Sequence, residues 1–312
     1  MESSDVVRQQ GFEVEGTVEV DVSVPAGRVR VHLVDEPGVH VEVKHETSAT
    51  ESLTTGLSGL LNWANEQFGG QLANQFGGQF GSRFGAGLGQ PAGPAEAVRD
   101  ARVEVTGSRL RVRSSEALPL RGVPLDVVVR APEGSHVIVT SDSADVTVTG
   151  PAGRLEIRTG TGHVTTDRAD ASSRVDSRSG KLRLGPMLGG LRAKTGSGDI
   201  EIASIGGNTV LHSGTGDVWL GAVQDDVQVR TAGGDVTIAD AASGRIQMGT
   251  GSGDVRVGIR PGVAAQIDLL SSSGTARSEL DVSDSPPPGD PLLFITGRTG
   301  TGTALVTTAT VG

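Results

Sequence analysis

Apolar and polar residues alternate along most of this chain, and the alternation repeats at a fixed interval between about Ser135 and Val257. The clearest marker is a turn that ends in Gly-Asp, as in TGSGD, SGTGD and TAGGD, with two apolar residues just after it. Its last position, which we call the anchor, recurs every eighteen residues with one step of nineteen, at Asp145, His163, Lys181, Asp199, Asp217, Asp235 and Asp254. A fixed period of this length indicates structural repeats that stack on one another.

Each repeat carries the same apolar positions relative to its anchor. One residue after the anchor stand Val146, Val164, Leu182, Ile200, Val218, Val236 and Val255, and three after it stand Val148, Thr166, Leu184, Ile202, Leu220, Ile238 and Val257. Six residues before it stand Val139, Ile157, Val175, Ala193, Leu211, Val229 and Met248. Successive side chains of a strand point to opposite faces, so apolar residues two apart predict strands with one inward face.

A fainter apolar column lies six residues after the anchor. It consists of Pro151, Ala169, Met187, Ile205, Val223 and Ala241. Three inward sides per repeat predict a roughly triangular coil, and neighbouring coils stack at about 4.8 Å. We therefore expect an all-β, single-stranded β-solenoid with 18-residue coils, whose glycine-rich corners use positive φ angles.

Flanking segments extend the β pattern beyond the repeat. Residues 11–46 alternate in three runs separated by PAG and DEPG, which suit hairpin turns, and residues 102–113 indicate another hairpin. Residues 294–309 restate the repeat with Thr303 at the anchor, and we expect them to form the closing coil. The predicted division is N-terminal β-hairpins continuous with the solenoid (1–52), an insert (53–95), a hairpin and first strand (96–134) and the solenoid (135–312).

The insert has a four-residue rhythm, QFGG QLAN QFGG QFGS RFGA GLGQ. Its apolar members are Phe68, Leu72, Phe76, Phe80, Phe84 and Leu88, and Trp63 precedes them. A spacing of four keeps side chains near one helical face, while each Gly costs about 1 kcal/mol relative to Ala, so we expect a partly helical insert. It is either a loop between strands or a segment that docks on its own solenoid, a like subunit or a membrane.

Composition narrows the class of protein. Aromatic residues are only 3% of the chain and glycines number 47, which suits a thin structure with a narrow core. The absence of cysteine excludes disulfides and thiolate chemistry. A net charge of −10 argues against nucleic acid as a partner. The chain shows no signal peptide and no apolar run of about 18 residues, so we expect a cytoplasmic protein or one at the periphery of a membrane.

The repeats resemble a bacterial family known as the putative adhesin or toastrack domain. The motifs that carry the resemblance are APEG at 131–134, then TGSGDIEI, SGTGDVWL, TAGGDVTI, TGSGDVRV and the terminal RTGTGTALV, within about Leu125 to Ala309. The resemblance implies a right-handed β-helix without known catalysis, a domain of unknown function often found in envelope-stress gene neighbourhoods. It implies no functional residues, and the segment from Leu53 to Gly93 departs from the family pattern.

The anchor aspartates admit two interpretations. The residues are Asp145, Asp199, Asp217, Asp235 and Asp254. Calcium-binding β-rolls also stack carboxylates beside glycine-rich turns, but they repeat their motif every nine residues, and the second corner here has no matching Asp. We therefore expect each carboxylate to accept hydrogen bonds from backbone N–H groups of its own turn, with a calcium-ordered module as the alternative.

Trp219 is the most distinctive single residue of the repeats. It lies two residues after its anchor, at the outward position that other coils fill with Thr147, Thr165, Arg183, Glu201, Thr237 and Arg256. An aromatic ring among outward polar side chains predicts an interaction site, with a partner or with the insert of the same chain.

Nothing in the sequence assembles a catalytic, metal or cofactor site. The Gly-X-Gly turns run into strands, whereas a dinucleotide-binding loop must run into a helix. A polysaccharide-processing β-helix enzyme needs aromatic platforms, and Trp63, Trp219 and Phe294 are too scattered. We expect a non-enzymatic scaffold or protein-interaction module, self-associating through the insert and peripheral to the cell envelope, with the enzyme and the calcium module as alternatives.

Overall fold

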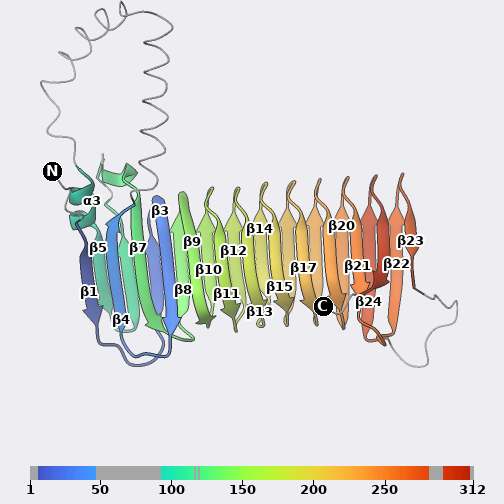
Figure 1. Ribbon diagram of the computed structural model, residues 1–312, viewed down its shortest axis with the longest axis horizontal. Coiled ribbons are helices and arrows are strands. Elements are labelled where there is room, and N and C mark those ends of the chain that lie inside the picture. Colours follow the sequence, from blue (N-terminus) through green and yellow to red (C-terminus); the bar gives the residue numbers. More distant parts are fainter. Residues whose placement is uncertain (1–5, 47–92, 116, 119, 281–290, 310–312) are drawn as a thin grey trace, which may run out of the picture.

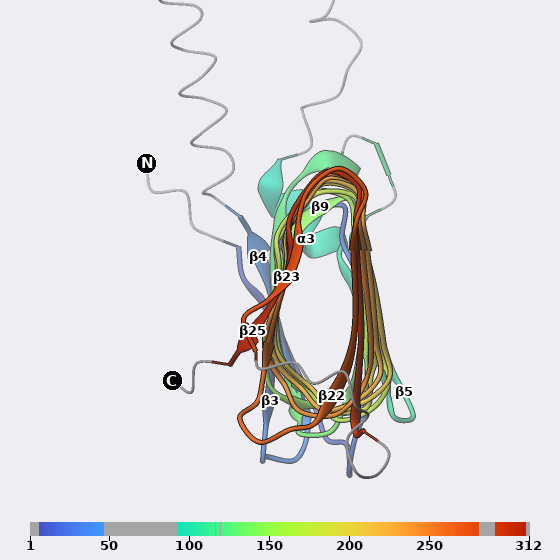
Figure 2. The same ribbon diagram turned by 90° about the vertical axis from the view of Figure 1, so that its right-hand side faces the viewer.

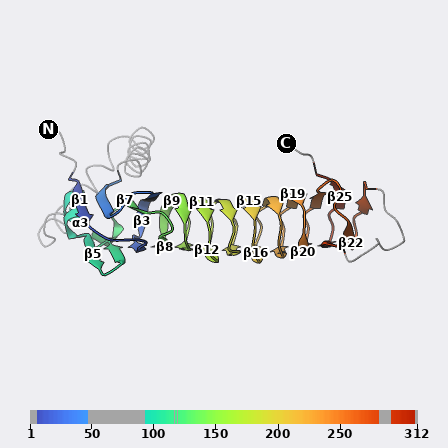
Figure 3. The same ribbon diagram turned by 90° about the horizontal axis from the view of Figure 1, so that it is seen from below.

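Two β-sheets face each other along a rod, and the chain winds from one sheet to the other at each corner (Figure 1). This computed structural model describes residues 6–46, 93–115, 117–118, 120–280 and 291–309. The core between the sheets consists of Val, Leu, Ile, Ala and Met side chains, while polar side chains alternate with them on the outside. Seen from below, the coils follow one another in a single row (Figure 3). The predicted β-solenoid is confirmed.

Within the described residues, the first sheet has 13 strands. Their spatial order is β1 (Arg8–Phe12), β4 (Val39–His45), β7 (Leu125–Pro132), β3 (Ala26–Val34), β9 (Ser143–Ala152), β11 (Val164–Ala169), β13 (Leu182–Met187), β15 (Ile200–Ile205), β17 (Val218–Val223), β19 (Val236–Ala241), β21 (Val255–Ile259), β25 (Ala304–Thr308) and β23 (Ala276–Ser278). From β3 through β23 every neighbouring pair is parallel, as stacked coils require.

The second sheet has 12 strands in the part of the chain that the structure describes. Their order, from the C-terminal end, is β22 (Ala265–Ser271), β24 (Leu293–Thr299), β20 (Gly244–Thr250), β18 (Val227–Thr231), β16 (Thr209–Ser213), β14 (Leu191–Thr195), β12 (Ser173–Ser177), β10 (Leu155–Thr159), β8 (His136–Ser141), β2 (Glu19–Ser23), β6 (Arg109–Arg113) and β5 (Arg102–Thr106). Only β5 and β6, which form the hairpin predicted within residues 102–113, are antiparallel.

The eighteen-residue register is confirmed through the regular coils. Ile200 of β15 faces Val218 of β17, and Val218 faces Val236 of β19. All three side chains are buried, so each column of the repeat becomes a continuous apolar ladder inside the rod. A one-residue slip of any strand would turn its apolar side chains outward, which fixes the register strongly.

Each coil has two sides, whereas the sequence pattern predicted three. The third apolar column lies in the first sheet, on the same strands as the other inward residues, as with Met187 at the end of β13 and Ile205 at the end of β15. Ala152, not Pro151, occupies this column in β9, because the register shifts between Thr166 and Arg168. Down its axis the rod is therefore a flattened oval (Figure 2).

The expected positive φ occurs at Gly180 of one anchor turn and at Gly190 of another corner, whereas most anchor-turn glycines are required by close packing. Gly216 is absent from the positive-φ residues, but a Cβ atom added to it would overlap the carbonyl oxygen of Gly198 in the preceding coil. A hydroxyl closes the same turn from within, because the N–H of Gly216 donates to Oγ of Ser213 at 3.0 Å. The equivalent bond from Gly234 to Thr231 measures 3.1 Å.

The N-terminal segment forms a coil of the rod and not the predicted hairpins. β2 lies between β6 and β8 in one sheet, and β3 lies between β7 and β9 in the other, with parallel pairing throughout. The turn from Pro25 to Gly27 is therefore a corner between the two sheets. The DEPG turn does not join paired strands either, because β7 lies between β3 and β4 and pairs with both.

The C-terminal segment is likewise inserted one position from its end of the rod. β24 pairs with β20 and β22, and β25 pairs with β21 and β23. The coil formed by β22 and β23 is thus outermost, and the segment 294–309 that the sequence placed at the end is penultimate (Figure 1). At each end of the rod, a coil from the nearby chain terminus therefore lies one position inside the outermost strands.

A short helix, α3 (Pro94–Asp100), was not predicted. It begins with Pro94 in its first turn, carries Glu96 there and Arg99 in the last turn, and buries Ala97 and Val98. It packs against β4 and the 3-10 turn η1 (Leu120–Gly122) at the N-terminal end of the rod. Nearly all of the insert, including its predicted helical part, lies outside the described residues.

Candidate functional site

The anchor aspartates link each coil to the next. The backbone N–H of Asp217 donates to Oδ1 of Asp199 at 3.1 Å, and Asp235 donates to Oδ1 of Asp217 at 2.8 Å. The same bond joins His163 to Asp145, Asp254 to Asp235 and Thr303 to Asp254. The expectation that each carboxylate closes its own turn is therefore wrong. Ser or Thr closes the turn, and the carboxylate supplies an acceptor for the following coil.

Two anchors show what the ladder needs chemically. His163 replaces the carboxylate with Nδ1, which accepts the N–H of Lys181 at 3.0 Å. Lys181 has only donors, and its ammonium pairs instead with the carboxylate of Glu201. A side-chain acceptor is thus the property that continues the ladder. Among the described residues, no group of three or more His, Asp or Glu side chains is arranged to hold a metal ion.

Trp219 projects from the outer face of the first sheet, as the sequence predicted. Its side chain is 44% exposed, and its strand neighbours are Glu201 and Thr237. The ring extends along β17 over Gly221, because a Cβ added there would lie 3.4 Å from Cη2 of the ring. A groove of about 250 Å³ runs beside it and is lined also by Arg183, whose guanidinium donates to Glu201 at 3.0 Å.

The remaining predicted interaction residues belong to the insert. Trp63, Phe68, Leu72, Phe76, Phe80, Phe84 and Leu88 lie outside the described residues. Their association role stays a prediction from sequence. Trp219 is thus the one member of that set whose geometry is described.

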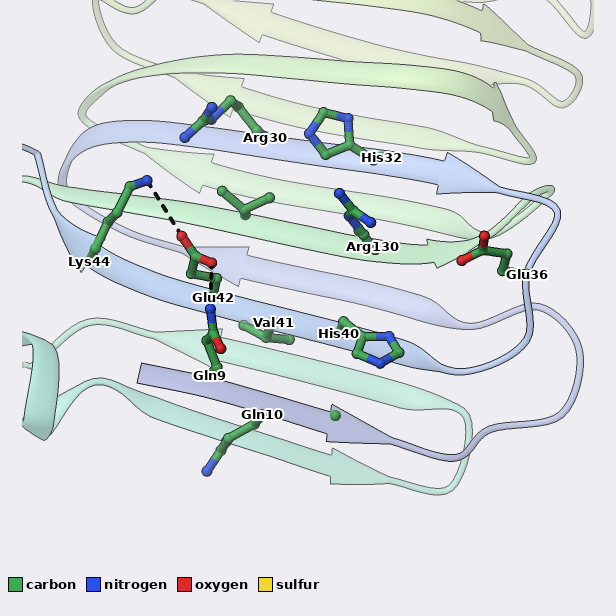
Figure 4. Close-up of a pocket in the computed structure, with 12 residues that line it drawn as sticks. Gln9, Gln10, Arg30, His32, Glu36, His40, Val41, Glu42, Lys44 and Arg130 are labelled. Atoms are coloured by element: carbon green, nitrogen blue, oxygen red, sulfur yellow. Dashed lines mark hydrogen bonds and ion pairs between the residues drawn. The ribbon is translucent and has the colours of Figure 1, made fainter. Parts of the chain in front are cut away.

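A larger groove, which the sequence did not predict, lies on the same face at the N-terminal end. It has a volume of about 850 Å³ and is lined by side chains of β1, β3, β4 and β7 (Figure 4). Its members include Arg30, His32, His40, Glu42 and Arg130. We call it the N-terminal groove.

Strand register aligns the groove side chains in two rows. Across β9, β3, β7, β4 and β1, the first row is Thr149, His32, Arg130, His40 and Gly11, each directly opposite the next. The second row is Thr147, Arg30, Val128, Glu42 and Gln9. The first row is therefore basic at its centre, and the second carries both signs.

The two charged residues of the second row, Arg30 and Glu42, both have partners nearby. The Arg30 guanidinium donates to Oδ2 of Asp126 at 2.6 Å, and Nζ of Lys44 lies 3.6 Å from that oxygen. Nε2 of Gln9 donates to Glu42 at 2.9 Å, and this bond, followed by Lys44, lowers the pKa of the Glu42 carboxyl. These groups form a closed network along one side of the groove.

The first row contains a histidine biased toward its neutral form. Burial lowers the pKa of His32, and the nearby guanidinium groups of Arg130 and Arg30 lower it further. Nδ1 of His32 is hydrogen-bonded to Oγ1 of Thr149 at 2.8 Å. Arg130 itself has no carboxylate partner among the described residues and points into the groove between His32 and His40 (Figure 4).

Sequence reasoning missed this groove because of strand order. Alternation places Arg30, His32, His40 and Arg130 on outward positions, but pairing β3 directly with β4 leaves no place for β7 between them. Once Arg130 is inserted, three scattered residues become one row. The sequence did indicate that His32 and His40, which lie on either side of Arg130, both occupy outward positions.

Together, the stacked coils define a parallel β-solenoid whose first sheet carries two grooves on its outer face. The chain belongs to the Toastrack DUF4097 family, whose family model matches residues 126–285. No curated protein matches the chain. None of the described helices is long and apolar enough to cross a membrane.

Several solved structures are similar to this chain, among them the following three. A putative adhesin from Bacteroides fragilis NCTC 9343 shares 11% identity over 96% of this chain and 97% of its own, with a TM-score of 0.44. A putative cell adhesion protein from Clostridium sporogenes ATCC 15579 shares 8% over 98% and 100%, with a TM-score of 0.23. A putative adhesin from Parabacteroides merdae ATCC 43184 shares 8% over 96% and 95%, with a TM-score of 0.36.

Proposed function

We propose that this protein is a non-enzymatic interaction module that associates with a second copy of itself through the outer face around Trp219. The observation that carries the proposal is the exposed indole, fixed over Gly221 on a rigid parallel sheet. Its polar neighbours Glu201 and Arg183 already bond each other, so the ring is available for contact.

The exposed ring is large enough to contribute measurably to association. Aromatic side chains bury 150–250 Å² each at interfaces, so covering the exposed part of Trp219 removes roughly 100 Å² from water. At about 25 cal/mol per Å² this contributes about 2–3 kcal/mol. One such anchor is typical of an interaction hot spot but needs further apolar area for a stable dimer.

The insert is the proposed source of that further area. Its residues Phe76, Phe80 and Phe84 recur every four positions in a chain that has few other aromatic residues. Ordering a glycine-rich backbone costs about 1–2 kcal/mol per residue, which favours a segment that orders on binding. We extend the proposal to peripheral contact of the insert with membranes, which would link the protein to the cell envelope.

Measuring mass in solution tests the proposal. Light scattering should show concentration-dependent association of the full chain, and the triple change Phe76→Ser, Phe80→Ser and Phe84→Ser should abolish it. Trp219→Ala should weaken association about tenfold or more, since 1.4 kcal/mol is a factor of ten, while the adjacent Thr237→Ala should leave it unchanged. All variants should retain the β-type circular dichroism of the unchanged chain.

Two further readouts separate the parts of the proposal. Co-sedimentation with anionic and neutral vesicles tests membrane contact, which the triple Phe change should remove. Fluorescence quenching of Trp219, in a chain with Trp63→Phe, should fall as the protein concentration rises. A strict monomer with unchanged quenching and no vesicle binding would overturn the proposal.

A further inference from the structure

We infer that the N-terminal groove is a second binding site, which takes an acidic peptide segment and binds its carboxylate through Arg130 between His32 and His40. This site is separate from the proposed association surface around Trp219. It lies on β1, β3, β4 and β7, whereas Trp219 lies on β17.

The groove presents donors in a line that a single anion can reach. His32 of β3 faces Arg130 of β7, which in turn faces His40 of β4. Neighbouring strands are about 4.8 Å apart, so the three side chains lie within about 10 Å. The row ends at Gly11, whose missing side chain leaves the His40 ring 3.3 Å from where a Cβ would be. No side chain therefore projects from this position at the β1 edge of the groove.

The charge pattern selects a singly charged ligand. Arg30 and Lys44 are paired with Asp126 and Glu42, so the groove has one cation, Arg130, without a carboxylate partner among the described residues. Glu36 lines the rim and repels a dianion. A carboxylate matches a single guanidinium in charge and planar geometry, while a phosphate would bring a second negative charge toward Glu36.

The shape and remaining lining favour an extended peptide as the carrier of that carboxylate. The groove spans four strands and its volume of about 850 Å³ is within the range of ligand pockets, which is about 300–1,000 Å³. Val128 gives it an apolar patch, and Gln9 and Glu42 supply polar groups on the neighbouring strands. Peptide amides use such mixed groups while an acidic side chain occupies the basic row.

Binding a carboxylate here must also change proton affinity. Burial and two guanidinium groups hold the pKa of His32 below its ordinary value, and a bound anion opposes the second effect. The groups that line the groove around His32 are Arg30 on its own strand, Arg130 on β7, His40, Glu42 and Lys44 on β4, and Glu36 in the turn. By linkage, the ligand raises the pKa of His32, and mild acid strengthens binding.

An NMR titration of the full chain tests the site. The probe is a heptapeptide with one central Glu among Ser and Thr residues, compared with the same peptide carrying Gln or phosphoserine. We expect the Glu peptide to shift the signals of His32 and His40 and to bind at least tenfold more tightly than either counterpart. Arg130→Gln should weaken binding tenfold or more without unfolding the protein, because Arg130 has no ion pair to lose among the described residues.

Matched controls keep the outcome decisive. Arg183→Gln removes a cation from the same sheet face in the regular coils and should leave peptide binding unchanged. Trp219→Ala should also leave it unchanged, which separates failure of this inference from failure of the association proposal. The Glu peptide should raise the pKa of His32 in wild-type protein and not in the Arg130→Gln variant.

Three results would overturn the inference. They are equal binding of the Glu and Gln peptides, unaltered binding after Arg130→Gln, and peptide-induced shifts located at Trp219. Free glucuronate forms the remaining arm of the experiment. If it binds as tightly as the peptide and displaces it, the carboxylate site is real but its ligand is a small sugar acid, and the peptide assignment is wrong.

Discussion

The regular coils from β8 to β21 and the N-terminal end use the same two sheets, but their neighbours in space differ in sequence distance. In the regular coils, side chains that face each other are eighteen residues apart, as with Glu201 and Trp219, or nineteen at the last step. At the N-terminal end, His32 bonds Thr149 across 117 residues. Repetition therefore produces ladders of like side chains in the first region, whereas the second gathers unlike residues into a groove.

The difference shows where such a rod can build a specific site. A ladder of Asp or Thr presents the same chemistry at every step, which suits stability. The N-terminal groove combines His32, Arg130 and His40 only because β7, which is distant in sequence, lies between β3 and β4. The edge strands at each end of a solenoid need to be covered, and here the segments that cover the N-terminal end also carry the side chains of the groove.

Removal of the inserted C-terminal coil should have the largest effect. A chain that ends before Leu293 loses β24 and β25, so β20 and β22 lose their common partner, and β21 and β23 lose theirs. We expect a loss of more than about 5 kcal/mol, which is a large part of the stability of a typical domain, and aggregation through the exposed strand edges. Urea unfolding and size-exclusion chromatography measure both effects.

Deletion of the edge strand β1 is the matching change at the other end. It pairs only with β4, so the loss should be smaller and the rod should stay monomeric at low concentration. Equal losses from the two deletions would contradict the interleaved role of the C-terminal coil.

Substitution of the glycine that precedes an anchor should have the next largest effect. A Cβ at Gly216 overlaps the carbonyl oxygen of Gly198, so Gly216→Ala should cost about 3 kcal/mol through displaced backbone. Gly249 has open space around its Cβ position, so Gly249→Ala should change stability by less than about 0.5 kcal/mol. Chemical denaturation compares the two variants. A neutral Gly216→Ala would show that the coils can separate slightly at low cost.

Breaking one step of the carboxylate ladder should cost less. Asp217→Ala leaves the N–H of Asp235 without its side-chain acceptor, and we expect a loss of about 1 kcal/mol because the site is exposed. Asp217→Asn keeps an acceptor oxygen and should lose only part of that. Equal losses in the two variants would mean that charge, and not the hydrogen bond, is the relevant property.

Calcium should not matter for this ladder. Each Oδ1 from Asp199 to Asp254 already faces a backbone N–H of the following coil. We expect the melting temperature to be the same in chelator and in millimolar calcium. An increase of about ten degrees on adding calcium would restore the calcium-ordered alternative, since a ligand that binds the folded state raises its stability.

A small effect is also expected in the acid response of two partly exposed carboxyls, one from each region. Hydrogen bonds from Lys181 and then Arg183 lower the pKa of Glu201, and bonds from Gln9 and then Lys44 lower that of Glu42. A lowered folded-state pKa gives stability above the unfolded value of 4.5 that is lost as pH falls through the folded pKa. Glu201→Gln and Glu42→Gln should each lose less than about 1 kcal/mol at pH 7.

Comparing melting temperatures at pH 7 and pH 3 checks the sign. The gap between wild-type protein and each Gln variant should narrow as the pH is lowered toward 3, because the wild-type carboxyls take up protons as the pH falls through their lowered pKa. A gap that widens in acid would contradict the assigned direction for either residue.

The sequence alone determined the regular part of this protein. Each regular coil contacts the coil eighteen or, at one step, nineteen residues away, so the period encodes the strand register, the buried columns and the outward position of Trp219. Because each coil makes the same contacts with the next, the same residue types recur at the same positions, and the β-solenoid and its anchor positions were therefore predictable.

Tertiary structure decided what does not repeat. Alternation says which face a strand presents but not which strand lies beside it, so the insertion of β7 between β3 and β4 had no signature in the sequence. The same holds for the penultimate place of β24 and β25, for the two-sided coil, and for the donor that each anchor carboxylate meets. Each depends on partners distant in sequence or on the next coil, and the N-terminal groove exists because of one of them.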